Sequence, residues 1–258
     1  MSLCLHFHGD LVGLLRRRWR GRPAVEIPGG RTASIKDVVE SFGLPHTEVG
    51  TLLVDDTAVD FTYLVQGGGR IDIHPIEPPW HVRIASLLRP RPLADLRFLV
   101  DANVGKLGRL LRMAGFDTAS YPHWSDARLA ECAAAEQRLL LSKDRGLLMR
   151  KEVEFGRYVR ATMPAEQLRE IINLLGIAEE MDPLSRCLEC NSPLQRVAKE
   201  EINHLLEPLT RKYYEEFSRC PTCHKIYWPG SHVDKMRVLL ADISPGPSDQ
   251  APLWRRTI

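Results

Sequence analysis

Four of the six cysteines form two Cys-x-x-Cys pairs, and this spacing constrains the fold more than any other feature. The pairs are Cys187 with Cys190 and Cys220 with Cys223, separated by 29 residues. Each short loop brings two thiolates to one ion, so the pattern predicts a tetrahedral Cys4 zinc site. Four thiolates leave no open coordination position, so this zinc is expected to be structural. The competing interpretation, two redox-active or unpaired cysteine pairs, is disfavoured because Tyr227 and Trp228 follow the second pair instead of a thioredoxin-like context.

Composition sets the class of protein around this site. The 258 residues are 44% hydrophobic and 26% charged, which is typical of one large or two to three small globular domains. This excludes a disordered, collagenous or coiled-coil chain. No apolar run is long enough to span a membrane and no secretory signal is recognisable, so a cytoplasmic location and no membrane partner are expected. The net charge is only +2, so any basic surface must be local.

The first 75 residues alternate short apolar runs with one helix. Strands are predicted at 3–8, 24–27, 51–54, 59–61 and 70–74, and a helix begins after Ser34 and ends at Gly43. This order of strands and helix resembles the ubiquitin-like β-grasp fold of the MoaD and ThiS sulfur carriers. The triple glycine Gly67–Gly69 stands where those carriers make their last turn. They end in a free Gly-Gly carboxylate, whereas this chain continues, so the glycines are interpreted as a hairpin turn.

Two further segments flank this region. The cluster Arg16–Arg22 could contact an anion or RNA, although a solvated strand end is the favoured interpretation. Prolines at 75, 78, 79, 90 and 92 predict a stiff linker and a domain boundary. The predicted domains are a β-grasp domain at 1–80, a linker at 81–95, an α/β domain at 96–180, a zinc ribbon at 181–243 and a mobile tail at 244–258.

The middle segment alternates strands and helices and places carboxylates at strand ends. Strands are predicted at 96–100, 118–121 and 138–142, with helices between them. Asp101 and Asp144 follow the first and third strands, and Asp126 follows the second after a short loop. Such alternation predicts a parallel sheet whose ligand crevice lies at the carboxyl ends of the strands, so the acids are expected to converge there.

Clustered carboxylates repel one another unless a cation is bound. Oxygen donors suit Mg²⁺ or Mn²⁺, which can polarise a phosphodiester and activate water. Simpler interpretations remain for each acid. Ser125 or Asp126 is a good helix N-cap, and Asp101 and Asp144 could be turn-forming residues after strands.

Three stretches then carry a family resemblance. They run from Phe98 to Asn103, from Gly105 to Thr118, and from Ser142 to Asp144. They resemble the Mut-seven C-terminal RNase family, a branch of the PIN nucleases, and the stretch 186–232 with both cysteine pairs resembles its zinc ribbon. The N-terminal segment resembles a ubiquitin-like domain often joined to it.

The resemblance implies a metal-dependent ribonuclease with Asp101, Asp126 and Asp144 as catalytic, metal-binding acids. It assigns supporting roles to Ser142 and Asn103. A fourth acid, common in PIN domains after the third, is missing at Arg145-Gly146-Leu147, which disfavours a second metal ion.

Substrate contacts are expected from basic and aromatic side chains near these acids and in the ribbon. The candidates for RNA binding are Lys106, Arg109, Lys143, Arg145, Lys225, Tyr227, Trp228 and His232. Solvated surface charges are the alternative for the basic residues, and packing on the zinc core is the alternative for Tyr227 and Trp228.

The sequence therefore predicts an α/β protein: an N-terminal β-grasp (α+β) domain, a PIN-like three-layer α/β/α domain and a zinc ribbon. The expected function is a ribonuclease using Mg²⁺ or Mn²⁺, with structural zinc, that leaves 5′-phosphate and 3′-hydroxyl ends. Its expected partners are RNA, single-stranded or with a structured end, and a protein bound through the β-grasp domain. The alternatives are a non-catalytic RNA-binding adaptor and a partner-docking protein.

Overall fold

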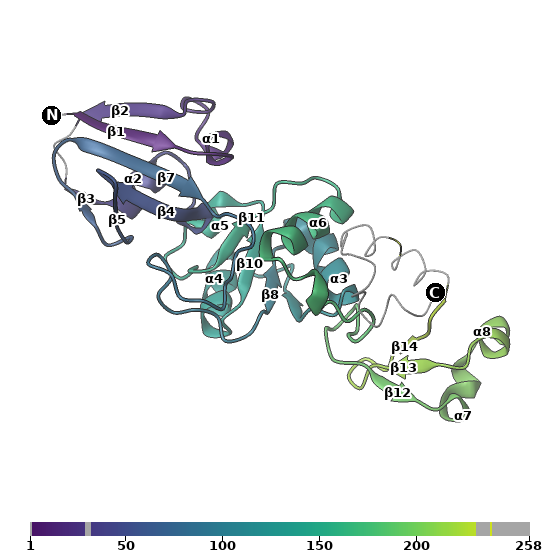
Figure 1. Cartoon of the computed structure of the whole chain (residues 1–258). Coiled ribbons are helices and arrows are strands. Elements are labelled where there is room, and N and C mark those ends of the chain that lie inside the picture. Colours follow the sequence, from purple (N-terminus) through teal and green to yellow (C-terminus); the bar gives the residue numbers. More distant parts are fainter. Residues whose placement is uncertain (1, 29–31, 231–237, 239–258) are drawn as a thin grey trace.

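The computed structural model of the chain describes residues 2–28, 32–230 and 238. Three parts follow one another along the molecule: a β-rich N-terminal part, a parallel sheet between helices, and a small antiparallel sheet (Figure 1). In the described part of the chain, no helix has the length and apolar character needed to cross a membrane.

The N-terminal part is a five-stranded mixed sheet with the order β2-β1-β7-β4-β5. β1 and β7 are parallel neighbours, and the other pairs are antiparallel. The strands are β1 (Ser2–Phe7), β2 (Ala24–Pro28), β4 (Val49–Val54), β5 (Thr57–Ala58) and β7 (Gly69–Pro75).

One face of this sheet is covered by helix α2 (Ile35–Ser41), which the sequence predicted. Ser34 caps it by accepting a 3.1 Å hydrogen bond from the Asp37 amide, and Gly43 ends it in a left-handed conformation with φ +83°. Alternate residues of β1, Leu3, Leu5 and Phe7, point into the core beneath it. The mixed sheet with one helix confirms the predicted β-grasp domain.

Shorter elements complete this part of the chain. They are α1 (Leu11–Leu14), β3 (Ala33–Ser34), the 3-10 helix η1 (His46–Glu48) and β6 (Leu64–Val65), with β3 pairing to β6.

Two local predictions here are wrong. Residues 59–61 are not a strand; the strand is β5 just before them, and Asp60 starts a turn by accepting a 2.8 Å hydrogen bond from the Thr62 amide. Val59 and Phe61 still pack on the core, which explains their alternating pattern. Gly67–Gly69 do not form a hairpin turn, because β6 pairs with β3 while β7 pairs with β1 and β4.

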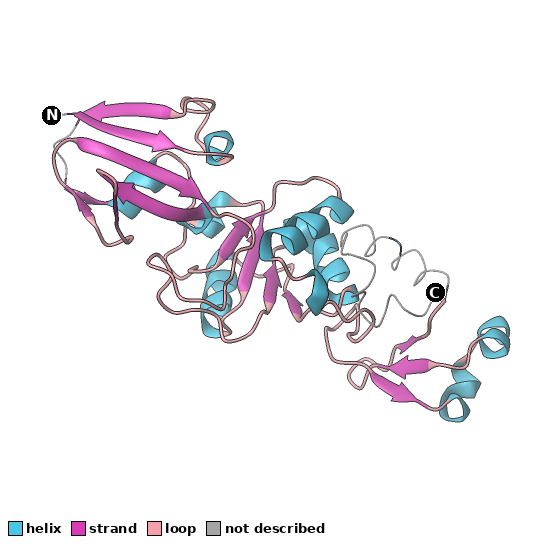
Figure 2. Cartoon of the chain, viewed as in Figure 1, coloured by secondary structure: helices cyan, strands magenta, loops and turns pink. Residues whose placement is uncertain are grey.

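The central part is a four-stranded sheet in the order β11-β10-β8-β9, with every strand parallel to its neighbour. The strands are β8 (Phe98–Val100), β9 (Thr118–Ser120), β10 (Leu139–Ser142) and β11 (Gly156–Tyr158). Helices flank the sheet on both sides (Figure 2). This arrangement confirms the predicted PIN-like α/β/α domain with a parallel sheet.

Strand residues alternate between two cores. Phe98 and Val100 of β8 pack under α3 (Gly105–Met113) and α6 (Pro164–Leu175). Leu99 faces the other way, toward α4 (Asp126–Ala135) and α5 (Arg145–Leu148). The chain therefore leaves β8 and β10 toward opposite faces of the sheet, which makes the boundary between these strands a topological switch point. Two 3-10 helices, η2 (Ala102–Val104) and η3 (Ala178–Glu180), complete this part.

The outer strands of this sheet are covered by side chains from the flanking parts. On β11, the Tyr158 amide donates to Glu48 Oε1 at 2.6 Å, and Glu48 is fully buried. On β9, the Thr118 amide donates to Asn191 Oδ1 at 2.9 Å. Each acceptor occupies a backbone donor that would otherwise offer a site for strand addition.

The segment 76–97 forms no helix or strand, yet it is packed between the first two parts. Val82 and Leu93 are buried in the core under α3 and α6. Arg89 is buried and donates to the carbonyls of Thr47 and Val49 at 2.9 Å each, and burial lowers its pKa to about 10. The predicted stiff linker thus contributes side chains to the fold.

The last described part is an antiparallel sheet in the order β12-β13-β14. It has a small core of Ile202, Leu206 and Phe217. Its elements are β12 (Gln195–Val197), α7 (Lys199–Ile202), η4 (Asn203–Leu205), α8 (Pro208–Tyr213), β13 (Phe217–Arg219) and β14 (Ile226–Tyr227). Together with the cysteine cluster, this sheet forms the predicted zinc ribbon. His232 and the predicted tail at 244–258 lie outside the described residues.

Candidate functional site

The carboxyl ends of β8 and β10 bring polar side chains together at the switch point of the parallel sheet. Asp101 directly follows β8, and Ser142 is the last residue of β10. Parallel strands end at one edge of a sheet, so residues far apart in the sequence meet there.

Ser142 is the centre of the hydrogen bonds at this edge, and it is fully buried. Its hydroxyl donates to Asp101 Oδ2 at 2.7 Å and accepts from the Asp144 amide at 2.8 Å. Asn103 Nδ2 donates to Asp101, and Asn103 Oδ1 accepts from the Lys143 amide at 3.0 Å. The two strand ends are therefore tied together by the side chains predicted as supporting residues.

Asp101 and Asp144 also act as local caps. Asp101 Oδ1 accepts from the Ala102 amide at 2.6 Å at the start of η2, and Asp144 Oδ1 accepts from the Gly146 amide at 2.7 Å at the start of α5. Asp101 and Asp144 therefore have the turn-forming role that was the alternative interpretation, and they also belong to the hydrogen-bonded group around Ser142. Asp144 Oδ2 has no hydrogen-bond partner among the described residues, which leaves it available to a ligand.

Asp126 is the first residue of α4, which begins after β9 at the same edge of the sheet. The helix cap is Ser125, whose hydroxyl accepts a long 3.5 Å hydrogen bond from the Arg128 amide. In the described part of the chain, the three aspartates do not form a group with ligand atoms within 4.8 Å of one another. Asp126 is exposed, and no hydrogen bond joins it to Asp101 or Asp144.

Most predicted RNA-binding cations near these acids are engaged within the protein. Lys143 Nζ donates to the Ala161 carbonyl at 2.7 Å, and Arg145 donates to the Leu14 carbonyl. Arg109 forms a 2.8 Å ion pair with Glu189. Lys106 on α3 is exposed and makes no polar contact within the described residues.

Of the predicted RNA contacts in the ribbon, some are likewise bonded within the protein and one is an exposed aromatic ring. Lys225 pairs with Glu189 at 3.0 Å, and Trp228 is 37% exposed. The Tyr227 hydroxyl accepts from the Leu188 amide and lies 3.1 Å from Cys187 Sγ, so Tyr227 packs on the cysteine cluster.

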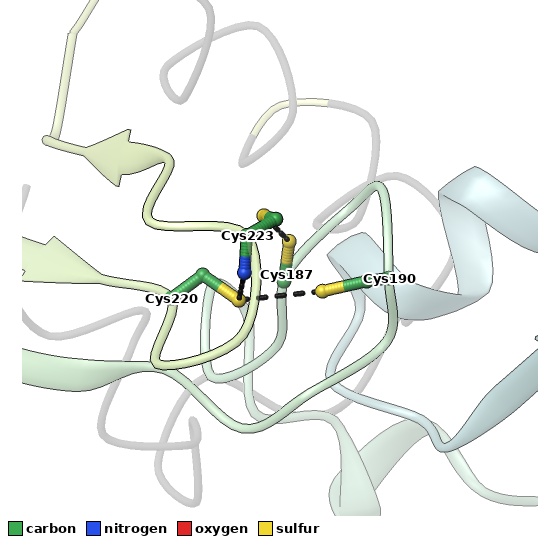
Figure 3. Close-up of side chains that lie close together, drawn as sticks. All are labelled: Cys187, Cys190, Cys220 and Cys223. Carbon is green, nitrogen blue, oxygen red and sulfur yellow. Dashed lines mark hydrogen bonds between the residues drawn. The ribbon is translucent and has the colours of Figure 1, made fainter.

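The four cysteines converge from two loops (Figure 3). The Cys187 and Cys223 sulfurs are 3.5 Å apart, the Cys190 and Cys220 sulfurs are 3.3 Å apart, and all four lie within 4.8 Å of one another. A tetrahedral zinc ion with four thiolates needs this donor set.

The two cysteine loops have the same backbone form. Asn191 and His224, each just after the second cysteine, have φ +68° and +61°, and their amides donate to the carbonyls of Cys187 and Cys220 at 3.0 Å. This conformation turns both thiols of a loop to one side.

The thiol pKa values follow from the crowding of the four sulfurs. Burial acts to raise the pKa of Cys187, but backbone N–H groups and the Tyr227 hydroxyl lower it overall. The Lys225 amide acts to lower the pKa of Cys223, but burial and the other cysteines raise it to about 12. The four converging sulfurs fit a zinc ion, which binds cysteines as thiolates.

The first cysteine loop docks on the nuclease-like sheet through buried polar groups. Arg112 of α3 donates to the carbonyls of Leu188 and Glu189 at 3.0 and 2.8 Å. Burial lowers the pKa of Arg112, which is offset in part by the cysteines and Glu189. Gly115 follows α3 with φ +98°, and a Cβ there would lie 2.3 Å from the Asp182 carbonyl oxygen, so only glycine fits.

A second group of ligand-type side chains lies on the outer face of the β-grasp sheet, and sequence reasoning missed it. His8 Nε2 is 2.8 Å from Asp72 Oδ1, and the rings of His8 and His74 stack with centroids 4.1 Å apart. Arg70 also donates to Asp72 at 2.9 Å. Burial acts to raise the pKa of Asp72, but the Arg70 and His8 hydrogen bonds lower it overall, so the carboxylate is already neutralised by the protein. The sequence signal that could have revealed this group is the two-residue alternation along β1 and β7, which places these polar side chains on one face of the sheet.

Comparisons with known proteins bear on both halves of the chain. A family model described as the Mut7-C RNAse domain matches residues 96–240, which is more than half of the chain. A second model, described as Mut7-C ubiquitin, matches residues 2–81. Neither the curated proteins nor the solved structures gave a match.

Proposed function

The chain belongs to the Mut7-C RNase domain family, and from this premise we propose that it is a divalent-metal-dependent ribonuclease. The observation that carries the proposal is the bonded group of Asp101, Asn103, Ser142 and Asp144 at the switch point of a parallel sheet. Ligands bind at this edge in open α/β folds. The substrate is RNA, cleaved by water to leave 5′-phosphate and 3′-hydroxyl ends.

Asp101 and Asp144, joined by Asp126 when a cation is present, are the proposed ligands. Carboxylate oxygens are the donors that Mg²⁺ and Mn²⁺ prefer. A divalent cation held by these carboxylates would supply Lewis-acid chemistry, polarising the phosphodiester and lowering the pKa of the attacking water. Asp126 lies outside the hydrogen-bonded group, and we propose that its exposed side chain turns toward Asp101 and Asp144 to complete the ligand set.

The remaining side chains position these groups. Ser142 and Asn103 both donate to Asp101, which fixes the direction of its carboxylate. Lys106, exposed on the helix that follows Asp101, is positioned to bind a phosphate oxygen of the substrate. The zinc ribbon, docked through Arg112, is proposed to stabilise this side of the domain and to present Trp228 for base stacking.

Cleavage of labelled single-stranded and hairpin RNAs by the full chain tests the proposal. With Mn²⁺ or Mg²⁺, Asp101→Asn and Asp144→Asn should each reduce the rate at least about 100-fold, as expected for loss of a metal ligand. Asp56→Asn is the matched control, because Asp56 is exposed in the β4–β5 turn at φ +63°, which asparagine tolerates.

Brief EDTA treatment should stop cleavage while the zinc content, measured by elemental analysis, is retained. Equal rates for the wild type and both site variants would refute the assignment. RNA binding without any cleavage, with every variant alike, would favour the adaptor function instead.

A further inference from the structure

An arginine-rich turn of the β-grasp domain carries charge that the rest of the protein does not neutralise. Five arginines lie within seven residues, and all five are exposed: Arg16, Arg17, Arg18, Arg20 and Arg22. Within residues 2–28, 32–230 and 238, none of them forms an ion pair with a carboxylate. The chain as a whole has a net charge of only +2, so this concentration of positive charge is local. Guanidinium groups gathered without acids favour a polyanionic ligand.

The turn is held in a defined conformation. The Arg16 amide donates to the Phe42 carbonyl at 2.8 Å, and the Trp19 and Arg20 amides both donate to the Arg16 carbonyl. The Trp19 ring packs on Phe42 with centroids 5.6 Å apart, and the guanidinium of Arg18 lies 5.1 Å from the Trp19 ring. A fixed backbone lowers the entropy lost when these side chains bind a ligand.

The turn also stands beside the proposed catalytic edge. Arg145, the residue after Asp144, donates to the carbonyl of Leu14 in α1. Arg160, which follows β11 at the same edge, forms a 2.7 Å ion pair with Asp10. Arg16 is two residues beyond Leu14, a reach of at most ~7 Å. Figure 1 shows α1 at the end of the β-grasp domain that faces α5.

The cations closest to the acids cannot serve the substrate as freely. Lys143, Arg145 and Arg109 are all engaged by groups of the protein. Among the predicted cations near the acids, only Lys106 is exposed without a polar contact in the described part of the chain, so an RNA strand of several nucleotides needs further positive charge, which the arginine-rich turn offers.

We infer that Arg16–Arg22 bind the phosphates of the RNA strand that is cleaved at the Asp101–Asp144 edge. This inference rests on the proposed ribonuclease function. The β-grasp domain is then part of the substrate site, and the substrate is a single strand of several nucleotides that reaches from the acids to the turn. Its affinity is strongly salt-dependent, whereas a di- or trinucleotide reaches only the acids.

The test measures binding and cleavage separately in the full chain. The triple variant Arg16→Gln, Arg17→Gln, Arg18→Gln removes three charges, and glutamine retains the Cγ that packs beside Gly43 at Arg16. Its matched control is Arg83→Gln, Arg91→Gln, Lys151→Gln, three exposed cations outside the turn. Far-UV circular dichroism and melting temperature establish that both variants fold like the parent.

Binding is measured in the Asp101→Asn background, using a fluorescein-labelled 20-nucleotide single-stranded RNA and anisotropy over a range of NaCl concentrations. The triple variant should bind about tenfold or more weakly, and the slope of log K against log [salt] should fall by about 2, or ~0.7 for each phosphate that the variant no longer binds. The control triple should change affinity less than about threefold. Equal reductions in both triples, or no reduction in either, would overturn the inference.

Cleavage with Asp101 intact separates this inference from the proposed function. The arginine triple should slow cleavage of the 20-nucleotide RNA at sub-saturating concentration and leave that of a trinucleotide unchanged. If neither parent nor variant cleaves but binding depends on the turn, the ribonuclease proposal fails and the RNA-binding surface stands. If the 20-nucleotide RNA is cut and bound independently of the turn, the inference fails alone. Loss of binding to phosphatidylserine vesicles, with RNA binding unchanged, would assign the turn to a membrane instead and overturn it.

Discussion

The two candidate metal sites of this chain differ in how closely their ligand atoms lie together. The four cysteine sulfurs lie within 4.8 Å of one another, whereas the ligand oxygens of the three aspartates, all among the described residues, do not. Each cysteine loop presets two ligands through its own backbone hydrogen bonds, so only two loops have to meet. The aspartates come from three separate strand ends, and two of them cap local structure.

The difference shows that ligands within one short loop are placed by the local chain, whereas ligands from separate strands are placed by the tertiary fold. A short loop fixes the distance between its two thiols regardless of the rest of the fold. Asp101 and Asp144 come from separate strands and meet only through hydrogen bonds that depend on the tertiary fold, while Asp126 begins a helix outside this group. We therefore expect loss of zinc to affect folding, and loss of the acidic site to affect catalysis.

Removal of zinc should have the largest effect. Structural zinc in isolated finger peptides contributes about 10–16 kcal/mol of apparent binding energy. A strong thiol-competing chelator, or Cys187→Ser, should release one zinc ion per chain and unfold the ribbon. Thiol reactivity and NMR spectra of the ribbon residues would report this, with Cys132→Ser as the control. If the ribbon stays folded without metal, the zinc site is not needed for folding, and the two sites do not differ in this respect.

Asp101→Asn should show the opposite profile. Its cleavage rate should fall at least about 100-fold, equivalent to ~2.7 kcal/mol of activation free energy. Its melting temperature should fall only slightly, because the single side-chain oxygen of asparagine can still accept at one of the two carboxylate positions, either from the Ala102 amide or from the Ser142 hydroxyl. A large drop in melting temperature would show that Asp101 is needed for folding, as the cysteines are.

Mn²⁺ should stabilise the wild type by an amount set by its concentration. At 100 times the dissociation constant the gain is about 2.7 kcal/mol of unfolding free energy. Asp126→Asn should weaken Mn²⁺ binding in calorimetry if the acid turns inward as proposed. Unchanged affinity in this variant would remove Asp126 from the ligand set and leave a two-acid site.

Ser142→Ala should reduce the stability of the fold, by much less than the loss of zinc. The substitution removes the buried Ser142 hydroxyl, which donates to Asp101 and accepts from the Asp144 amide, and its loss costs about 1–3 kcal/mol. Ser41→Ala is the control, because its hydroxyl is exposed and bonds only to its own helix, and its expected change is within about 0.5 kcal/mol. Chemical denaturation measures both. Equal stability of the two variants would argue against a tight hydrogen-bonded centre.

Local sequence signals predicted the elements that carry the sites. The apolar runs before Asp101 and Asp144 form buried parallel strands, and the Cys-x-x-Cys spacing predicted the converging sulfurs. Both signals are local, because a short strand or loop is determined by residues adjacent in sequence. The strand predicted at 59–61 failed for the same reason: Asp60 starts a turn within an alternating apolar pattern.

Side-chain pairs between distant segments were not predictable. Glu189 forms exposed ion pairs with both Arg109 and Lys225, so two predicted RNA contacts have an acidic partner within the protein. Nothing near Arg109 in the sequence indicates a partner eighty residues away. Glu48 lies more than a hundred residues from Tyr158, and its role at the sheet edge became visible only in the fold. The sequence defines which residues are charged, but the tertiary fold decides which charges remain available.

The covered edges of the central sheet limit which fragments of the protein can be expressed alone. A fragment limited to 96–180 loses Glu48 from one side and Asn191 from the other, and each outer strand then presents bare amides. Such a fragment is prone to self-association by edge-to-edge pairing. The central part is therefore not an independent unit, and a fragment made for expression should include the N-terminal part and the cysteine loops.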